Sequence, residues 1–311
     1  MAKGIVVYLS YTGTTKSIAE SIYKGMSPHM EQCDIVRLRD TDPKDLTGYD
    51  LIGIGSPVRL AKMPAELNAF IKGMTSLEGK NSFVFNTHGA LPVNFMRDAV
   101  TALKDKGLTV IGFMDWFCSV WLSYIPKPYL TDGHPDGIDL KEAEDFGREM
   151  AERSQRVYDG ETNLIQELSV GIEYDMLYGA LPSENDIGIA RENILEARAQ
   201  KLSINMDKCT RCNVCVDVCP TNSIDFSVTP PVFKDNCDRC WLCEQICPEA
   251  AVEFNWPPLF VNHNVAVERI FLPVLKRAEE MGRYRPLIPM EDVGWDTPLF
   301  KTTRPPRFKI V

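Results

Sequence analysis

Short apolar runs alternate with amphipathic stretches over residues 1–158. Five of the runs have the length and composition of buried strands, and they cover residues 4–9, 33–38, 51–55, 81–86 and 108–113. Stretches with the helical period lie at 14–26, 63–74, 93–107 and 139–158. The resulting order, β-α-β-β-α-β-α-β-α, predicts the α/β class, with a mostly parallel, doubly wound sheet of five strands covered by helices on both faces.

The rest of the chain divides where this pattern changes. Residues 114–138 are aromatic and rich in proline and glycine, so we expect an ordered loop. Residues 159–200 are expected to bridge to a second domain, with a short helix near 189–200. That second domain, 201–256, repeats itself at an offset of 28 residues, which predicts two copies of a short strand and a metal loop. The tail, 257–311, contains one expected helix at 264–283 and is a candidate docking segment.

The formal net charge of −9 argues against a nucleic-acid partner, which would be expected to meet a basic surface. No window approaches the roughly 18 apolar residues of a membrane span, and the start lacks the apolar core of a secretory signal. We therefore expect a soluble, cytoplasmic protein without a membrane span. Acidic side chains dominate residues 161–200 and basic ones residues 256–311, so these segments either dock with each other or are solvated surface.

Most of the ten cysteines lie in two stretches of identical spacing, CTRCNVCVDVCP at 209–220 and CDRCWLCEQICP at 237–248. Zinc is usually bound by two separated pairs of ligands and does not need three cysteines at i, i+3 and i+6 followed by Cys-Pro. A [4Fe-4S] cluster is bound by four thiolates, and such a run supplies three of them. Cys33 and Cys118 lie alone in apolar surroundings, where we expect buried small hydrophobes, and this usage favours a reducing compartment.

Both motifs resemble those of the bacterial two-cluster ferredoxins, in which the fourth cysteine of each run serves the other cluster. The resemblance covers most of residues 201–256 and implies a small α+β domain. It also implies two cluster sites, one on Cys209, Cys212, Cys215 and Cys247 and the other on Cys237, Cys240, Cys243 and Cys219. Trp241 and Asp238 lie inside the second loop, where such residues shield or tune a cluster or, more often, are surface residues.

The first strand is followed by SYTGTTKSIAE at 10–20, where a helix begins. Hydroxyl side chains and the N–H groups of a helix N-terminus form a phosphate cradle, although a Ser/Thr-rich start is by itself more often structural. The loop matches the S/T-x-T-G-x-T pattern of the flavodoxin family, and the resemblance covers residues 1–158. It implies an FMN phosphate site built from Ser10, Tyr11, Thr12, Gly13, Thr14 and Thr15.

Two further loops, GSPVRLAKMP at 55–64 and NTHGALP at 86–92, follow the third and fourth strands. The resemblance places the flavin ring beside Pro57, Val58, Arg59, Thr87, His88 and Gly89. Arg59 either stabilises the anionic reduced flavin or faces solvent or a partner. His88 either hydrogen-bonds the ring or caps its loop.

The aromatic side chains Trp116, Trp121 and Tyr124 of the expected loop have two interpretations. They could cover a flavin or form a substrate pocket. We expect them instead to pack in the core beneath the loop, because that is the more common role of such side chains.

Joined on one chain, the two parts resemble the flavodoxin-ferredoxin fusion family sometimes called ferrodoxins, found among anaerobes and methanogens. The resemblance implies an electron-transfer protein that relays low-potential electrons between an FMN and two [4Fe-4S] clusters to a partner oxidoreductase. A redox protein would be its donor and another its acceptor. The alternatives are an FMN-dependent reductase of a small molecule or NAD(P)H, and an electron-input subunit of a larger redox complex. Homo-oligomerisation is left open.

Overall fold

The computed structural model describes residues 2–59, 62–90, 92, 94–120, 127–168, 201–254 and 267–294. Contacts divide the chain into two units, one holding residues 1–119 and 133–174 and the other residues 120–132 and 175–311. The segment 120–132 therefore belongs to the second unit, although both of its neighbours along the chain lie in the first.

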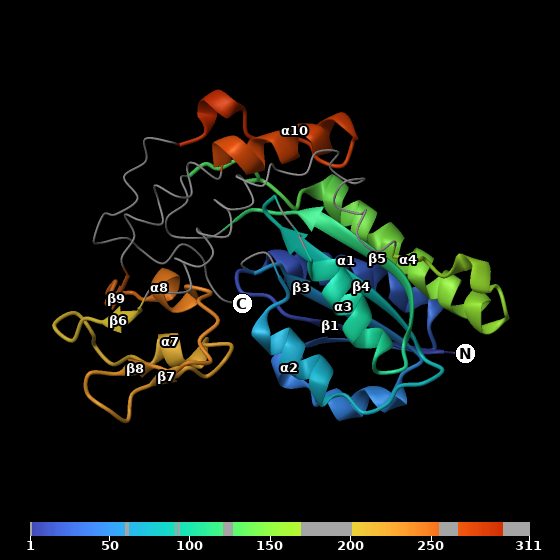
Figure 1. The fold of residues 1–311 in the computed structure, drawn as a ribbon, viewed down its shortest axis with the longest axis horizontal. Helices are drawn as coiled ribbons and strands as arrows, with labels where there is room; N and C mark the ends of the chain where they lie inside the picture. Colours follow the sequence, from blue (N-terminus) through green and yellow to red (C-terminus); the bar gives the residue numbers. More distant parts are fainter. Residues whose placement is uncertain are drawn as a thin grey trace. The chain divides into compact units, whose positions relative to one another are not determined.

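A parallel sheet of five strands forms the centre of the first unit, in the order β2-β1-β3-β4-β5 (Figure 1). Its strands are β1 (Lys3–Tyr8), β2 (Gln32–Arg37), β3 (Leu51–Pro57), β4 (Asn81–His88) and β5 (Thr109–Phe117). All residues of β4 are buried, as expected for a central strand with helices on both faces. The predicted doubly wound sheet of the α/β class is confirmed.

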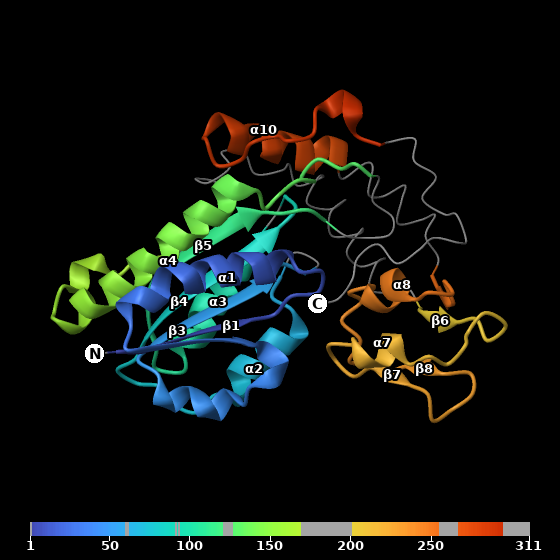
Figure 2. The ribbon, with the colours of Figure 1, turned by 180° about the vertical axis from the view of Figure 1, so that it is seen from behind.

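Four helices cover the sheet, α1 and α4 on one face and α2 and α3 on the other (Figure 2). Their bounds are α1 (Thr14–Met26), α2 (Ala65–Gly73), α3 (Phe95–Lys104) and α4 (Gly137–Tyr158). The alternation of side chains along β4 divides the core accordingly. Val84 packs in the cluster beneath α2 and α3, whereas Phe83 and Phe85 pack beneath α1 and α4.

Helix α4 is fixed at its start and along its contact with α1. Asp136 accepts hydrogen bonds from the backbone of the first turn, and Asp139 bonds back to Asp136 N, which makes a capping box. Oδ2 of Asp139 also lies 2.5 Å from Nδ1 of the buried His134. Along the contact, a Cβ at Gly25 would lie 1.8 Å from a backbone oxygen of α4, so only glycine allows this approach.

Strand β5 extends through Phe117, so the expectation that residues 114–117 belong to a loop is wrong. Trp116 contacts Phe146 of α4 edge-on at 5.8 Å, and its Nε1 donates to Glu142 Oε2 at 3.0 Å. Because Trp116 is 2% exposed and lies in the core, its predicted core packing is confirmed. Trp121 and Tyr124 lie outside the described residues.

The outer edge of β5 is covered by the start of the expected bridge. Gln166 N donates to Ile111 O at 3.3 Å, and Gln166 Oε1 accepts from Phe113 N at 3.2 Å. A short 3-10 turn, η4 (Thr162–Leu164), leads into this contact. The bridge therefore begins by satisfying backbone groups of an edge strand. The helix expected near 189–200 lies outside the described residues.

The two isolated cysteines differ in burial. Cys118 is 3% exposed, as predicted, and burial raises the pKa of its thiol. Cys33 is only half-buried, in β2, although burial and the neighbouring Asp34 raise the pKa of its thiol to about 12. Both thiols are therefore protonated at neutral pH.

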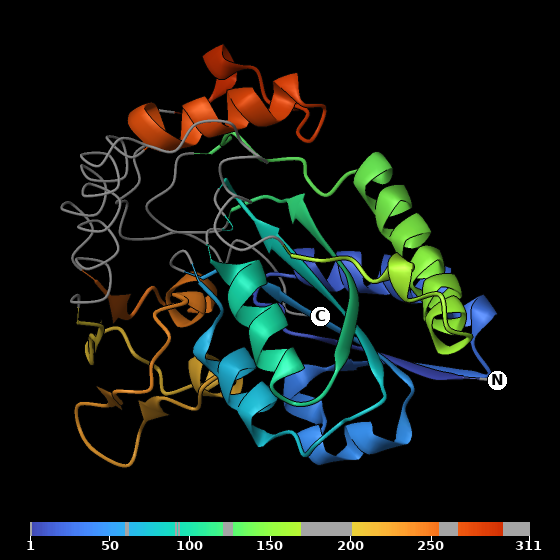
Figure 3. The same cartoon turned by 45° about the vertical axis from the view of Figure 1, so that its right-hand side comes forward.

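The second unit contains two short antiparallel pairs, β6 (Ser203–Ile204) with β9 (Val252–Glu253) and β7 (Ile224–Asp225) with β8 (Val232–Phe233) (Figure 3). Two short helices, α7 (Val214–Asp217) and α8 (Leu242–Ile246), follow the cysteine loops. β7 and β9 occupy equivalent positions of the repeat. The predicted small α+β domain is confirmed.

The described part of the tail folds into a π-helical turn, η5 (Val267–Phe271), followed by α10 (Leu272–Glu280) and the 3-10 turn η6 (Met290–Asp292). Pro273 lies in the first turn of α10, where its missing N–H costs no hydrogen bond. The predicted helix at 264–283 is thus shorter, and 264–266 lie outside the described residues.

The tail is held to the segment 127–132. Tyr284 donates its hydroxyl to Leu130 O at 2.5 Å, and Gly294 N donates to Pro128 O at 2.8 Å. Tyr284 and Leu130 are both buried, so this contact is part of the core of the second unit. Among the helices in the described ranges, none has the length and apolar character needed to cross a bilayer.

Candidate cofactor sites

The loops expected to bind a flavin meet at the carboxyl edge of the sheet. Beyond the strands, Leu9 N donates to Gly55 O and Val58 N to Thr87 O, each at 2.9 Å. These bonds place the start of the loop after β1 beside the end of β3, and the loop after β3 beside the end of β4. Doubly wound sheets bind their ligands at this edge.

The loop after β1 presents backbone donors at the start of α1. Ser10 Oγ accepts hydrogen bonds from two backbone N–H groups, one of them Gly13 N at 3.2 Å. Gly13 has a φ of 95°, a left-handed conformation that glycine adopts without strain. In the described part of the chain, the N–H groups of Thr12, Thr14 and Thr15 have no hydrogen-bond partner. Such N–H groups at a helix N-terminus fit a phosphate.

Two side chains of this loop are bonded to other elements. Thr15 Oγ1 lies 2.8 Å from Thr87 Oγ1, and the two residues are 1% and 2% exposed. Tyr11 donates its hydroxyl to Glu66 Oε2 of α2 at 2.8 Å. The Thr15–Thr87 bond links the start of α1 to the end of β4. It therefore fixes the expected phosphate loop relative to one of the expected ring loops.

The loop after β3 forms a tight turn. Arg59 N donates to Lys62 O at 2.9 Å, and Lys62 N donates to Arg59 O at 3.1 Å. Pro57 and Val58 are half-buried, while Arg59 is only 7% exposed. A solvent-facing Arg59 is therefore wrong. Leu60 lies outside the described residues.

The end of β4 carries a buried polar group. His88 Nε2 lies 2.7 Å from Asp115 Oδ2 on β5, and its ring meets Phe117 edge-on at 4.6 Å. The Nδ1 atom of His88 is buried and has no hydrogen-bond partner in the described chain. His88 thus bonds to the neighbouring strand rather than capping its loop. Gly89, next along the chain, is half-buried.

Asn86 lies two residues before His88 in β4, so its side chain is on the same face of the sheet. It pairs in register with Asp115 of β5. It is 0% exposed, and neither of its amide atoms has a partner among the described residues. Buried polar atoms without partners cost about 1–3 kcal/mol each, so such a set fits a ligand bearing both donors and acceptors, as a flavin ring does. Neither Asn86 nor Asp115 was expected from the sequence, although polar residues at the carboxyl end of an apolar strand are a usable signal.

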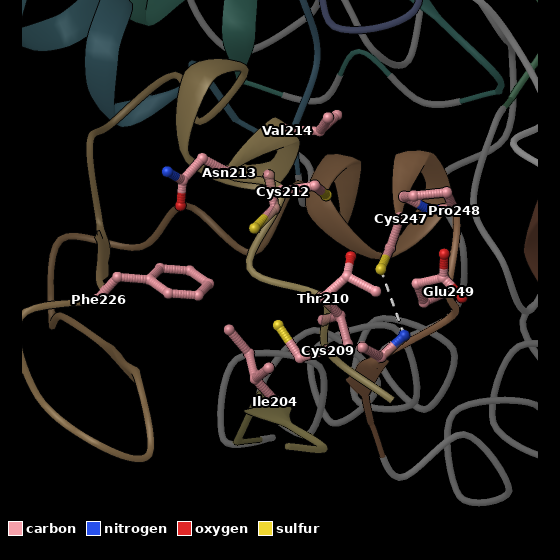
Figure 4. Close-up of a pocket in the computed structure, with 13 residues that line it drawn as sticks. Ile204, Cys209, Thr210, Cys212, Asn213, Val214, Phe226, Cys247, Pro248 and Glu249 are labelled. Atoms are coloured by element: carbon pink, nitrogen blue, oxygen red, sulfur yellow. Dashed lines mark hydrogen bonds between the residues drawn. The ribbon is translucent and has the colours of Figure 1, made fainter. Parts of the chain in front are cut away.

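In the second unit, Cys209, Cys212, Cys215 and Cys247 line one pocket, although Cys247 comes from the other motif. Figure 4 shows the sulfur atoms of Cys209, Cys212 and Cys247 turned toward one another. Burial raises the pKa of the Cys215 thiol to about 11, and the charges of Cys247, Cys212 and Cys209 add to the rise. Four cysteines gathered around one pocket fit a metal centre, which binds thiolates.

The other four cysteines form a second group. Burial raises the pKa of the Cys243 thiol, and Cys240, Cys237, Cys215 and Cys219 add to the rise through their charges. Cys215 and Cys219 of the first motif are therefore both within electrostatic reach of the second loop. The pocket brings together the first set of four, and the second set stays a prediction.

The two loops share their backbone conformation. Arg211 and Asn213 have φ values of 55° and 61°, and the equivalent residues Arg239 and Trp241 have 54° and 55°. Left-handed residues of this kind turn successive N–H groups to one side of a loop, which forms an anion-binding concavity. A thiolate-bound cluster carries negative charge, so both loops fit it.

The fourth cysteine of each motif accepts a backbone hydrogen bond. Ser223 N donates to Cys219 Sγ and Ala251 N to Cys247 Sγ, both at 3.3 Å. These pairs are 28 residues apart, as are the motifs. Hydrogen bonds to the sulfurs are among the features that set the potential of a cluster.

Comparison with known proteins supports both parts of the chain. A family model described as a flavodoxin domain matches residues 5–103, and one described as a 4Fe-4S binding domain matches residues 202–225. An uncharacterized protein of Methanocaldococcus jannaschii is 28% identical over 152 residues, which are 47% of this chain and 96% of that protein. A probable flavodoxin 2 of Bacillus subtilis is 26% identical over 162 residues, 50% of this chain and 97% of its own. A solved archaeal flavodoxin, 23% identical, covers 49% of this chain and 99% of its own with a TM-score of 0.40.

Proposed function

We propose that this chain, which carries a flavodoxin-like domain at residues 5–103 and a 4Fe-4S ferredoxin-type domain at residues 202–225, relays low-potential electrons. The two domain types make it an electron-transfer redox protein. In the proposal it holds one FMN within residues 1–158 and two [4Fe-4S] clusters within 201–256. Redox proteins serve as its donor and its acceptor.

The observation that carries the proposal is the pocket lined by four cysteines drawn from both motifs. When bound, FMN would supply a carrier of two electrons taken singly, and each [4Fe-4S] cluster a carrier of one. The chain's own part is to bind and orient them. Cys209, Cys212, Cys215 and Cys247 would hold one cluster, and Cys237, Cys240, Cys243 and Cys219 the other.

At the flavin site, open N–H groups at the start of α1 would bind the phosphate. Buried polar atoms of Asn86 and His88, which have no partner in the described chain, would meet the ring. The fixed Thr15–Thr87 bond would set the distance between these two ends of the site.

Anaerobic purification followed by iron, sulfide and flavin analysis tests the proposal. We expect about eight irons and about one FMN per chain, because each cluster contains four irons. About four irons would leave a single cluster and refute the two-cluster relay. A chain without flavin, which FMN titration also fails to load, would refute the flavin half.

Paired substitutions test the crossed ligation. If Cys212 and Cys247 serve one cluster, Cys212→Ala with Cys247→Ala should lose that cluster alone and keep about four irons. Cys240→Ala with Cys247→Ala should lose both clusters. Cys33→Ala, which changes a cysteine outside the motifs, is the control and should keep all the iron. The reverse pattern in the two double variants would mean that each motif ligates its own cluster.

A second candidate, an FMN-dependent reductase of a small molecule or NAD(P)H, is favoured by one observation. The buried His88–Asp115 pair could hold a proton next to the expected ring loop, as a two-electron reduction requires. Steady NAD(P)H oxidation by the purified chain with no acceptor protein would support the reductase. His88→Gln should then lower the turnover per bound FMN, measured on samples of known flavin content.

A further inference from the structure

The two cysteine loops differ at one equivalent position. The first loop has Asn213 and the second has Trp241, and both residues are left-handed, with φ values of 61° and 55°. Among non-glycine residues, asparagine is enriched in this conformation, whereas a bulky side chain there is an outlier. A residue kept in a conformation that disfavours it is a reason to look for a function.

Trp241 also closes its loop. It is 1% exposed and contacts Phe254 edge-on, with ring centroids 5.4 Å apart, so the expectation of a surface residue is wrong. Asn213, by contrast, is exposed. The neighbouring ligands follow the same division, because Cys212 is exposed and its counterpart Cys240 is half-buried. At these two positions the first loop is the more exposed and the second the more buried, and we call them the open and the closed loop.

Charge differs in the same direction. The closed loop has Asp238 and Glu244 where the open loop has the uncharged Thr210 and Val216. In return, the open loop has an aspartate, Asp217, where the closed loop has a glutamine. The closed loop therefore carries one more negative charge than the open loop.

We propose that Trp241 excludes water from the second cluster and thereby holds its reduction potential below that of the first. The inference rests on the proposed function, since it requires both clusters. A cluster bound by four thiolates is an anion, and reduction adds one electron to it. Burial in a low-dielectric site disfavours that added charge, and solvent exposure is a known determinant of cluster potential. Trp241 is thus a positioning residue that acts on the cluster by excluding solvent.

The consequence is that the two clusters accept electrons in a fixed order. The first electron from a reductant settles on the cluster of the open loop, and the second enters the closed loop. The face around Cys212 is then where the protein exchanges single electrons with a partner. Each exchange oxidises this cluster by one electron and reduces the partner by one.

Two reciprocal substitutions test the proposal in the full chain. Trp241→Asn copies the open loop into the closed one and suits the left-handed backbone, and Asn213→Trp does the opposite. Trp241→Phe is the control, because it keeps an aromatic cover. The measurement is a dithionite titration with redox mediators, in which electron paramagnetic resonance follows each cluster. Deuterium coupling after exchange into D2O reports water near each cluster.

We expect the wild type to show two potentials, with strong deuterium coupling only at the higher-potential cluster. Trp241→Asn should shift the reduction equilibrium of the lower-potential cluster at least tenfold toward the reduced form. For one electron this is a rise of about 59 mV in its reduction potential. The substitution should also give that cluster deuterium coupling, while Trp241→Phe leaves both readouts unchanged. Asn213→Trp should lower the higher potential.

A wild type with eight irons and two equal cluster potentials would overturn this inference but not the proposed function. The same holds if Trp241→Asn leaves both cluster potentials unchanged. A wild type with only about four irons would instead refute the two-cluster function, and this inference with it. Iron analysis of every sample therefore separates the two failures.

Discussion

The hydrogen bond between Thr15 and Thr87 permits a quantitative test of how the flavin site is held. Its oxygens are 2.8 Å apart and both residues are almost completely buried. Thr87→Val keeps the shape of the side chain but leaves the Thr15 hydroxyl buried without a partner. Stranding a buried hydroxyl costs about 1–3 kcal/mol, whereas replacing both partners by apolar groups is nearly neutral.

Each single variant should lose stability, because each leaves one buried hydroxyl without its partner. Thr87→Val strands the hydroxyl of Thr15 at the start of α1, and Thr15→Val strands that of Thr87 in β4. The double variant, which removes both hydroxyls, should be nearly neutral, so the coupling energy should be about as large as the two single losses together.

The assay must report on the first unit alone, because a chain with two units need not unfold in one step. Hydrogen exchange followed by mass spectrometry gives separate values for peptides from α1 and β4. The expected loss corresponds to exchange about 5- to 150-fold faster in the single variants. Thr14→Val, at a half-buried neighbour, is the control and should exchange like the wild type. Strictly additive single effects would refute the bond.

Three further predictions use other features of the first unit. Gly25→Ala should destabilise the unit by about 1–3 kcal/mol in the same exchange assay, because the new Cβ would clash with the backbone of α4. Gly137→Ala is the control and should have little effect, because a Cβ there would lie in open space. Cys33, whose pKa is raised to about 12, should react with iodoacetamide at pH 8 roughly 10³-fold more slowly than a free thiol, and the rate should rise with pH. Fast labelling of Cys33 or Cys118 would contradict the raised pKa of its thiol. Burial and a hydrogen bond raise the pKa of Tyr49 to about 12. Its contribution to stability is therefore intact below pH 10 and is lost as the pH rises toward 12. Tyr49→Phe should remove one late-ionising group from a spectrophotometric titration of the tyrosines.

The sequence predicts the first unit well where one physical signal dominates. Helix α1 begins and ends where the helical period does, and each apolar run lies in a strand. Strand β5 was predicted too short because Asp115 interrupts the apolar run near its end. At the edge of a sheet, one side of a strand can carry such a residue, and only the paired backbone shows that the strand continues.

The cofactor sites were predicted unevenly for a related reason. Spacing along the chain assigns three cysteines of each run to one cluster, and the resemblance to two-cluster ferredoxins assigns the fourth. Burial of Trp241 and Arg59 depends on which distant residues cover them, and a local pattern does not contain that information. The burial of Asn86 without a partner likewise depends on the elements packed around β4 and not on its place at the end of an apolar run.

The segment 120–132 has a consequence for how the two units could have been joined or could be parted. The chain passes from one unit to the other after residue 119, again after 132 and again after 174, so the units are interleaved rather than placed end to end. A gene fragment ending near residue 168 would encode Leu130 without Tyr284, the residue that covers its carbonyl. A cut at one junction near residue 168 would therefore separate the segment 120–132 from the tail that it contacts.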